Sequence, residues 1–326
     1  MSKISILLYA LLLFSSCADK LPKVNVKREK GIDVLADSIY FSDLRCLTLQ
    51  DGKLFISNVS DDQIICLDRD LALVTILGKK GQGPGELLGI SQYAIKDSSL
   101  VVLNGGNNRI NIYNTDNALM KEYSLGNNVI RFHTAYRFGF DGKQLIGCSS
   151  LAETPLATYN LDTGEQTFWG EGYKFHLAVQ SVVRNGRHTC LYENTYISVS
   201  DNMPYIEVYD ANSHMLINKY DYSQIDNVKK SLKAIEKRKN EASNSYQIIC
   251  DDIYVANGHL YLLFANIVGS YHVNEIIEFE LNPQINPISI IKLPGEIYSS
   301  FCVSDSLLYA YNSYNNILEK FVMTYK

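Results

Sequence analysis

Basic and aromatic side chains gather in two stretches of the chain, NNVIRFHT (127–134) and WGEGYKFHLAVQSVVRNGR (169–187). Arginine forks bind carboxylates and sulfates, and aromatic faces pack against sugar rings, so this combination points to an anionic glycan or another anion. The alternative is that these are ordinary solvated loop charges. The candidate ligand-binding residues are Arg131, His133, Trp169, Tyr173, Lys174, His176 and Arg187.

Motifs for nucleophilic or phosphate chemistry are weak. The chain has no GxSxG element, which argues against a nucleophile elbow. Gly78 and Gly83 have the spacing of a phosphate-binding loop, but Pro84 stands where the motif requires lysine. The carboxylate pair Asp251–Asp252 is adjacent in sequence, and neighbours on a strand point to opposite faces. We therefore expect this pair to be a poor acid/base couple.

The overall charge excludes one class of partner. The 326 residues carry 30 basic and 35 acidic side chains, for a formal net charge of −5. A generic nucleic-acid binder needs a basic face, so we expect no nucleic-acid partner.

The N-terminal segment predicts export. Lys3 precedes the apolar run from Ile4 to Phe14, which is too short to span a membrane and suits a signal-peptide core. The following Ser15-Ser16-Cys17 resembles the lipobox of bacterial lipoproteins, in which the cysteine is acylated. We expect a signal peptide over 1–16, a tether over 17–23 and an outer-membrane anchor at Cys17, facing the periplasm or the cell surface. Plain secretory cleavage is the alternative.

A repeated unit of short alternating strands occupies the rest of the chain. Each unit has a polar turn between its first and second strands, and successive turns lie about 50 residues apart, which is the period of propeller blades. The turns are marked by Asp51, Asp97, Asp141, the neighbourhood of Asn194, Asn257 and Asp305. The sequence therefore predicts an all-β, six-bladed β-propeller over 24–326.

Two features complete the predicted architecture. The last repeat ends after three strands, and the segment from Val24 to Leu35 can supply the fourth, closing the ring. Apolar residues at helical spacing near 223–245 predict one helical insertion, which either covers the rim or docks a partner. These residues are Ile225, Val228, Leu232 and Ile235.

Six further cysteines lie inside apolar stretches, and no two have CxxC spacing. They are Cys46, Cys66, Cys148, Cys190, Cys250 and Cys302. We expect buried free thiols, although an exported protein could also form disulfides.

The lipobox, the segment VVLNGGNNRINIYN (101–114) and the segment LGKKGQGPGEL (77–87) together resemble six-bladed propeller lipoproteins of gut-type Gram-negative bacteria, related to NHL-repeat and TolB-like propellers. The resemblance covers roughly residues 20–326 and implies a fold and a compartment, with no activity. It also implies that Arg109 packs between blades against a loop partner.

A metal-dependent activity is disfavoured. Lactonase-type propellers hold a divalent ion at the starts of the innermost strands. Those starts, expected here around Leu44, Gln92, Ala135, Gln247 and Ser299, lack carboxylates. Only His188 and Asn185 are plausible ligands there, so we expect no metal and no cofactor.

The sequence thus favours a non-enzymatic envelope propeller that binds a glycan or an envelope protein partner. The alternative is a polysaccharide lyase or hydrolase with its site on the same loop face. Histidines and carboxylates that converge in the channel mouth would favour chemistry, and a flat aromatic face would favour binding. A purely structural role would show as an exposed apolar patch.

Overall fold

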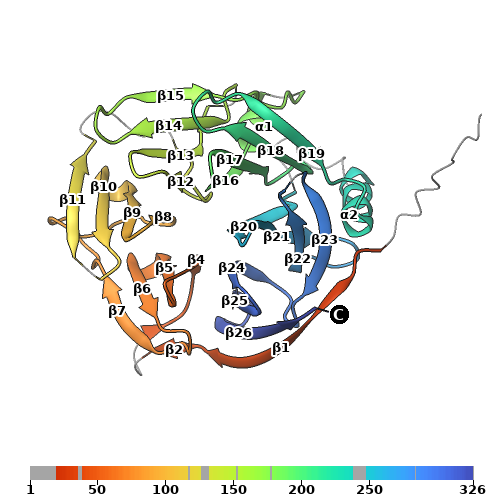
Figure 1. Cartoon of the computed structure of the whole chain (residues 1–326), viewed down its shortest axis with the longest axis horizontal. Helices are drawn as coiled ribbons and strands as arrows, with labels where there is room; N and C mark the ends of the chain where they lie inside the picture. The colour runs from red at the N-terminus through yellow and green to blue at the C-terminus, as the bar shows by residue number, and fades with distance from the viewer. Residues whose placement is uncertain are drawn as a thin grey trace, which may run out of the picture.

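The protein is an all-β ring of sheets around a central axis, as the computed structural model shows (Figure 1). The structure describes residues 20–35, 39–116, 118–125, 132–151, 153–176, 178–237, 247–282 and 284–325. The predicted signal peptide over 1–16, the predicted anchor at Cys17, the candidate ligand residue Arg131 and the part of the predicted helical insertion over 238–245 lie outside these residues. The ring has the arrangement of a β-propeller, which agrees with the predicted fold class.

Four sheets of the ring each contain four antiparallel strands, and the first strand of each lies nearest the axis (Figure 1). The first two sheets comprise β4 (Leu44–Gln50), β5 (Lys53–Asn58), β6 (Gln63–Leu67), β7 (Leu73–Leu77), then β8 (Tyr93–Lys96), β9 (Ser99–Asn104), β10 (Arg109–Asn114) and β11 (Leu119–Ser124). The next two comprise β12 (Gly139–Phe140), β13 (Gln144–Cys148), β14 (Leu156–Asn160), β15 (Gln166–Trp169), then β16 (Arg187–Tyr192), β17 (Thr195–Ser200), β18 (Tyr205–Asp210) and β19 (Leu216–Asp221).

The remaining strands form one eight-stranded sheet that contains both ends of the propeller. Its C-terminal strands are β20 (Cys250–Ala256), β21 (His259–Asn266), β22 (His272–Glu280), β23 (Asn286–Lys292), β24 (Tyr298–Ser304), β25 (Leu307–Asn312) and β26 (Ile317–Thr324). Strand β1 (Lys23–Ile32) pairs antiparallel with β26 and, through Lys23 and Val24, parallel with β23. The predicted N-terminal closing strand is therefore confirmed. A small hairpin, β2 (Val34–Leu35) with β3 (Ile39–Tyr40), follows it.

The hairpin turns follow the residues that marked the repeat. Asp51, Asp97, Asn257 and Asp305 all adopt positive φ values between 50° and 53°, which Asn and Asp tolerate better than most residues. At the third mark, the Asp141 carboxylate instead accepts the backbone N–H groups of residues 143 and 144. The turn chemistry read from the sequence therefore locates the hairpins correctly.

Adjacent sheets bury their faces against each other. One apolar cluster, for example, joins Leu44, Ile56 and Ile65 of the first sheet to Tyr309 and Leu318 of the last strands. All six cysteines of the described propeller are free, and five of them are buried. The prediction of packed thiols is confirmed.

The glycine-rich segment between β7 and β8 is a tight structural loop. Arg109 donates from Nη1 to the carbonyl oxygen of Gly83 at 3.0 Å and forms an ion pair with Glu122 at 3.2 Å. Tyr113 donates from its hydroxyl to the carbonyl oxygen of Gly85 at 2.8 Å. The expected loop partner of Arg109 is thus confirmed.

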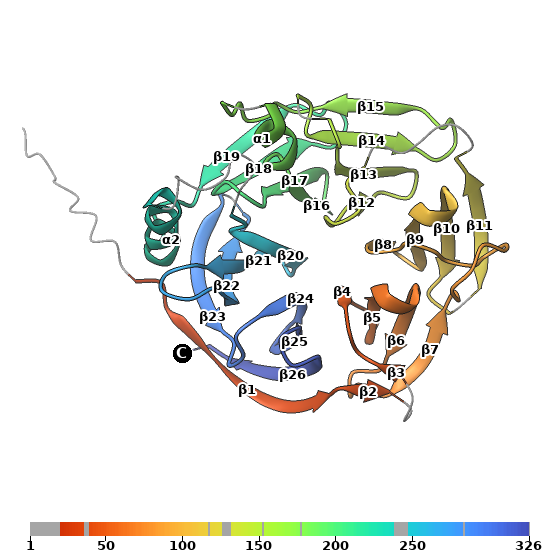
Figure 2. The ribbon, with the colours of Figure 1, turned by 180° about the vertical axis from the view of Figure 1, so that it is seen from behind.

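Two helices lie within the described residues. The predicted insertion forms α2 (Asp226–Lys237), which packs on the outer side of the ring with Val228 and Ser231 buried (Figure 2). The shorter α1 (Ala178–Val183) was not predicted. Neither described helix has the length and apolarity needed to cross a membrane.

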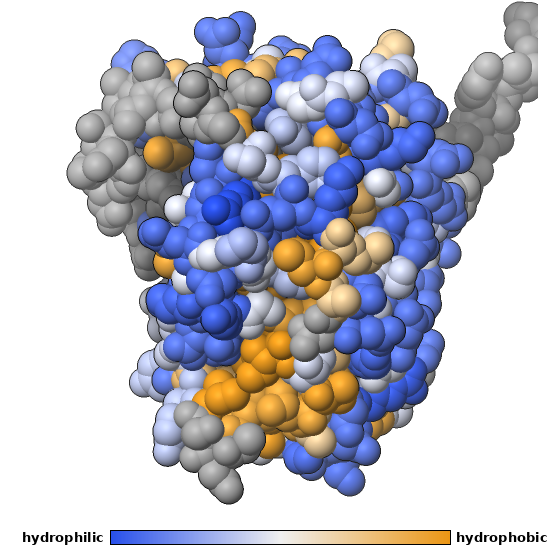
Figure 3. Space-filling view, turned by 90° about the vertical axis from the view of Figure 1, so that its left-hand side faces the viewer, coloured by the Kyte–Doolittle hydropathy of each residue, from blue (hydrophilic) through white to orange (hydrophobic). Residues whose placement is uncertain are grey.

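The rim also exposes apolar side chains on its outermost strands. Figure 3 shows an apolar area on the side of the ring that carries β7 and β11. Leu73 and Val74 of β7 and Leu119 and Met120 of β11 are between 37% and 59% exposed. These strands are sheet edges, so the exposed groups lie outside the packed core.

Candidate functional site

A buried ion pair crosses the centre of the ring. Arg137, just before β12, donates from Nε to Asp252 Oδ1 at 2.5 Å and from Nη2 to Asp252 Oδ2 at 2.8 Å. Arg137 is 8% exposed and Asp252, in β20, is 3% exposed. Burial opposes ionisation of the Asp252 carboxyl, but Arg137 more than compensates and holds its pKa below the usual value.

The same guanidinium also reaches the first and last sets of strands. Arg137 Nη2 donates to the carbonyl oxygens of Leu47, at 3.1 Å, and Phe301, at 3.2 Å. Ser300 donates from Oγ to Asp252 Oδ2 at 2.8 Å and accepts the backbone N–H of Leu47 at 3.0 Å. Side chains and backbone from four parts of the ring therefore meet at one point.

Two pockets, which we take as the two openings at the ring axis, lie along the innermost strands on either side of the residues that contact this ion pair. Along the innermost strands, the earlier residues Arg45, His188 and Asp251 line one pocket, of about 280 Å³. The later residues Thr48 and Tyr254 line another, of about 320 Å³, together with Arg137. We call the first the mouth pocket. Its lining residues are Arg45, His133, Ala135, Tyr136, Cys148, Ser149, Ser150, Val183, Gly186, His188, Asp201, Ile248, Cys250 and Asp251.

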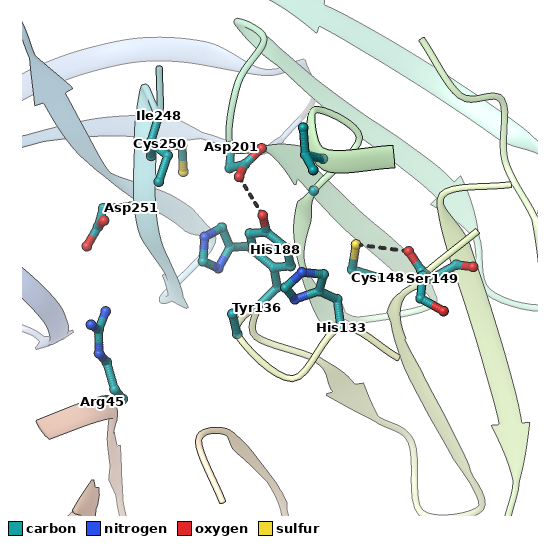
Figure 4. A pocket seen from close by; sticks show the side chains of 14 residues that line it. Arg45, His133, Tyr136, Cys148, Ser149, His188, Asp201, Ile248, Cys250 and Asp251 are labelled. Carbon is teal, nitrogen blue, oxygen red and sulfur yellow. Dashed lines mark hydrogen bonds between the residues drawn. The ribbon is translucent and has the colours of Figure 1, made fainter. Parts of the chain in front are cut away.

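One wall of the mouth pocket is a tyrosine–aspartate pair. Tyr136 donates from its hydroxyl to Asp201 Oδ2 at 2.6 Å (Figure 4). A Cβ atom at Gly186 would overlap the Tyr136 hydroxyl, so glycine is needed for this approach. Asp201 is 1% exposed, and its burial raises the pKa to about 6 in spite of the hydrogen bonds from Tyr136 and Asn202.

Two histidines border this pair. His188 is 3% exposed and accepts the backbone N–H of Arg137 at Nδ1, at 3.4 Å. Burial lowers its pKa to about 4, so the ring is neutral at pH 7 and carries its hydrogen on Nε2. The exposed ring of His133 lies 4.8 Å from that of Tyr136, between centroids, and partial desolvation lowers its pKa.

Asp251 faces Arg45 from across the mouth pocket (Figure 4). It forms no hydrogen bond or ion pair with any described residue. Burial raises its pKa to about 7, although Arg45 acts in the opposite direction. Arg45 itself pairs with Asp43 at 2.7 Å. Asp251 is therefore a carboxyl group that a ligand could use without displacing a partner.

The sequence-predicted residues do not gather at one place. Of the described ones, only His133 lines the mouth pocket. Trp169 stacks on His214 with 4.5 Å between ring centroids and an interplanar angle of 8°. Lys174 and His176 are exposed and do not line the pocket.

Arg187 requires a correction, because it is fully buried and forms an ion pair with Glu207. Tyr173 lies against the Arg187 guanidinium and donates from its hydroxyl to Glu207 at 3.0 Å. The charge of Arg187 is thus neutralised inside the fold. An alternating strand pattern could not show this, since the partner is 20 residues away on β18.

The expectation that the innermost strands start without carboxylates is wrong for β20. That strand begins at Cys250, three residues later than the start expected at Gln247, so Asp251 and Asp252 are its first acids. The register shifts between Cys250 and Asp252, and the two carboxylates act separately, one in the mouth pocket and one in the ion pair. Asn185, the other expected ligand, instead holds the Tyr173 backbone.

Metal binding has no geometric support within the described ranges, where no group of three or more His, Cys, Asp or Glu side chains could hold an ion. The mouth pocket instead offers hydrogen-bond acceptors on Asp201 and Asp251 and donors on Arg45 and His188. It is suited to a small polar molecule with both donors and acceptors.

Comparison with known proteins identifies the fold alone. No family model matches the chain, and no curated protein matches it. A DUF4221 family member from Bacteroides vulgatus has a TM-score of 0.58 at 14% identity, covering 94% of this chain and 99% of its own. A Bacteroides fragilis protein described as exported has a TM-score of 0.60 at 11% identity, covering 93% and 95%. A beta-propeller domain from Myceliophteria thermophila has a TM-score of 0.51 at 9% identity, covering 92% and 100%. At these identities, what the chain shares with all three is a β-propeller fold.

Removing Asp252 should strongly destabilise the ring. In Asp252→Ala the Arg137 charge stays buried without its partner, and we expect a loss of about 3–5 kcal/mol in the free energy of unfolding, measured by urea denaturation. The double variant Arg137→Met/Asp252→Ala should regain part of this loss. A cost below about 1 kcal/mol for the single variant would contradict the central role of the pair.

Replacing Asp251 should change how stability depends on pH. Its pKa is raised on folding, so the folded state binds the proton more tightly and the wild type loses stability as pH rises from about 4 to about 7. Asp251→Asn mimics the protonated form. We expect it to be more stable than wild type at pH 8, by about 2 kcal/mol. Thermal melts should show this difference disappearing below about pH 4, and an equal difference at both extremes would refute the assignment.

Proposed function

We propose that this protein is an outer-membrane lipoprotein, anchored through Cys17, whose propeller binds a small polar ligand without converting it. The ring counts six blades when the eight-stranded sheet is divided at β1 into β20–β23 and the set of β24, β25, β26 and β1. The proposed relationship is to NHL-repeat and TolB-like lipoprotein propellers. The binding site is the mouth pocket.

The observation that carries this proposal is the Asp251 carboxyl, which pairs with no described residue and lies in a pocket bordered by Arg45, His188 and Asp201. Sugars present hydroxyl groups that both donate and accept, and a volume of about 280 Å³ suits one terminal sugar residue. The mouth pocket is lined by two carboxyl groups, those of Asp201 and Asp251, and by one arginine, Arg45. This balance favours a neutral or amino sugar over the anionic glycan that the loop residues indicated.

We prefer binding to catalysis because two of the four histidine and aspartate side chains that line the mouth pocket already hydrogen-bond within the fold. His188 accepts the Arg137 N–H, and Asp201 accepts the Tyr136 hydroxyl. Groups held in this way orient a ligand well but are less free to exchange protons. His133 and Asp251 remain available to contact the ligand.

Blocking the pocket should abolish binding. We would measure melting temperatures with a panel of neutral, amino and uronic sugars, since a ligand at 100-fold above its Kd stabilises by about 2.7 kcal/mol. A neutral or amino sugar should stabilise the wild type and Ala118→Trp, a control on an outer hairpin, but not Ala135→Trp at the pocket rim. Stabilisation that persists in Ala135→Trp would place the ligand elsewhere, and no stabilisation by any sugar would reject the glycan.

A polysaccharide lyase or hydrolase is the second candidate, because histidines and carboxylates do converge in the channel mouth. Burial raises the pKa of Asp201 to about 6 and that of Asp251 to about 7, close to the working range of a general acid or base.

This candidate predicts turnover with a defined pH profile. Wild type incubated with polysaccharides should release reducing ends or unsaturated products, with apparent pKa values near 6 and 7. Asp201→Asn should lower the rate by about 100-fold or more. Glu193→Gln, at the opposite opening, is the matched control. The absence of product from wild type across the panel would eliminate the enzyme.

A further inference from the structure

A basic surface lies on the outer rim where the described chain begins. Lys20 and Lys23 border the same groove as Lys230 of α2, and Leu21 packs into the core cluster beneath this helix. We call the surface the basic rim, and it consists of Lys20, Lys23, Lys229, Lys230, Lys233 and Lys237.

Most of these lysines have no carboxylate partner among the described residues. Lys230 forms an ion pair with Asp226 at 2.6 Å, and Lys229 is within 3.4 Å of Gln224 Oε1. The other four form no ion pair with a described carboxylate, and all six are exposed. Some lysines elsewhere, such as Lys53 and Lys292, have carboxylate partners, so the rim is distinguished by how many lysines it brings together. The described acids of this surface are Asp221 and Asp226 in the groove and Glu236 of α2, so six lysines face three carboxylates. This local excess of positive charge on a protein of net charge −5 needs an explanation.

Helix α2 is amphipathic, with an apolar side packed on the ring and an exposed side rich in lysine. Val228 and Ser231 are buried against the ring, with Ile225, Leu232 and Ile235 partly buried beside them. The exposed side carries four of the six lysines of the basic rim, with Asp226 and Glu236 as the acids of that segment. Apolar contacts therefore hold α2 on the propeller and leave its lysines free for an anionic partner.

Chain length fixes how close this surface is to the proposed anchor. Two residues, Ala18 and Asp19, separate Cys17 from Lys20, and the three extended Cα–Cα steps between them span at most about 10 Å. That distance equals about one Debye length at physiological ionic strength. An acylated Cys17 would thus hold Lys20, and the groove that it borders, within electrostatic range of lipid headgroups.

We propose that the basic rim docks on an anionic phospholipid surface and so orients the propeller beside the membrane. The inference rests on the proposed anchor at Cys17. The rim lies on the outside of the ring (Figures 1 and 2), so docking there sets the channel axis roughly parallel to the membrane. Both channel openings, including the mouth pocket, then remain accessible from the side.

Vesicle co-sedimentation tests this surface without the acyl chains. The mature chain carrying Cys17→Ser should bind vesicles rich in phosphatidylglycerol and should not bind phosphatidylcholine vesicles. Binding should fall steeply as salt rises from about 0.1 M to about 1 M. Because each lysine near the surface contributes about fivefold, Lys229→Glu/Lys233→Glu should weaken binding by more than tenfold.

The matched control is Lys96→Glu/Lys143→Glu, which changes the net charge equally at exposed positions away from the rim. Its binding should stay within about threefold of the parent, and both double variants should keep the parent melting temperature, since neither changes a buried group. Equal weakening by both pairs, or no preference for anionic vesicles, would overturn the proposal.

A separate measurement tests the anchor. Detergent-phase partition of the full chain, with mass analysis of its N-terminal peptide, reports acylation of Cys17. An unmodified Cys17 would reject the anchor, and with it the orienting role, even where vesicle binding succeeds. An acylated chain whose rim variants bind vesicles normally would reject the rim alone.

Discussion

The ion pair between Arg137 and Asp252 is the interaction on which the centre of this molecule depends. Sheets of a propeller contact their neighbours around the ring, but contacts across the channel need long polar side chains. A buried guanidinium is costly unless all its donors are satisfied. Here Nε and Nη2 donate to a carboxylate, a hydroxyl and two backbone carbonyls from different parts of the ring, and Nη1 donates to the Cys46 sulfur at 3.6 Å. Arg137 lines the pocket at the opposite opening, and its backbone N–H is accepted by His188, which lines the mouth pocket.

Ring closure depends on β1 in a comparable way. This strand pairs with both β23 and β26, so the N-terminal and C-terminal ends of the propeller are held in one sheet. Without it, β26 would present an unpaired edge. Closure also places the start of the described chain, at Lys20, beside α2, where the basic rim lies.

The two openings of the channel differ in chemistry although the same strands line them. The mouth pocket contains Asp201, Asp251 and two histidines, whereas Glu193 is the carboxylate at the opposite opening. Desolvation moves the pKa values of the two aspartates toward neutrality and those of the histidines away from it. The pocket therefore changes charge between about pH 6 and 7, and we expect the proposed ligand binding to depend on pH in this range.

The sequence by itself determined those features that local patterns encode. Strand alternation and turn residues such as Asp51 and Asn257 located the hairpins, and the incomplete last repeat predicted the closing strand. Local patterns did not locate most residues of the candidate site. His133 was found from its residue type, but Arg187 proved to be neutralised by Glu207, and Asp251 was discounted because it was judged only as a couple with Asp252, whose side chain is expected on the opposite face of the strand. Arg137 and Asp252 are 115 residues apart and meet only across the channel. Periodicity is a property of neighbouring residues, whereas burial and charge pairing at the axis exist only once the ring has closed.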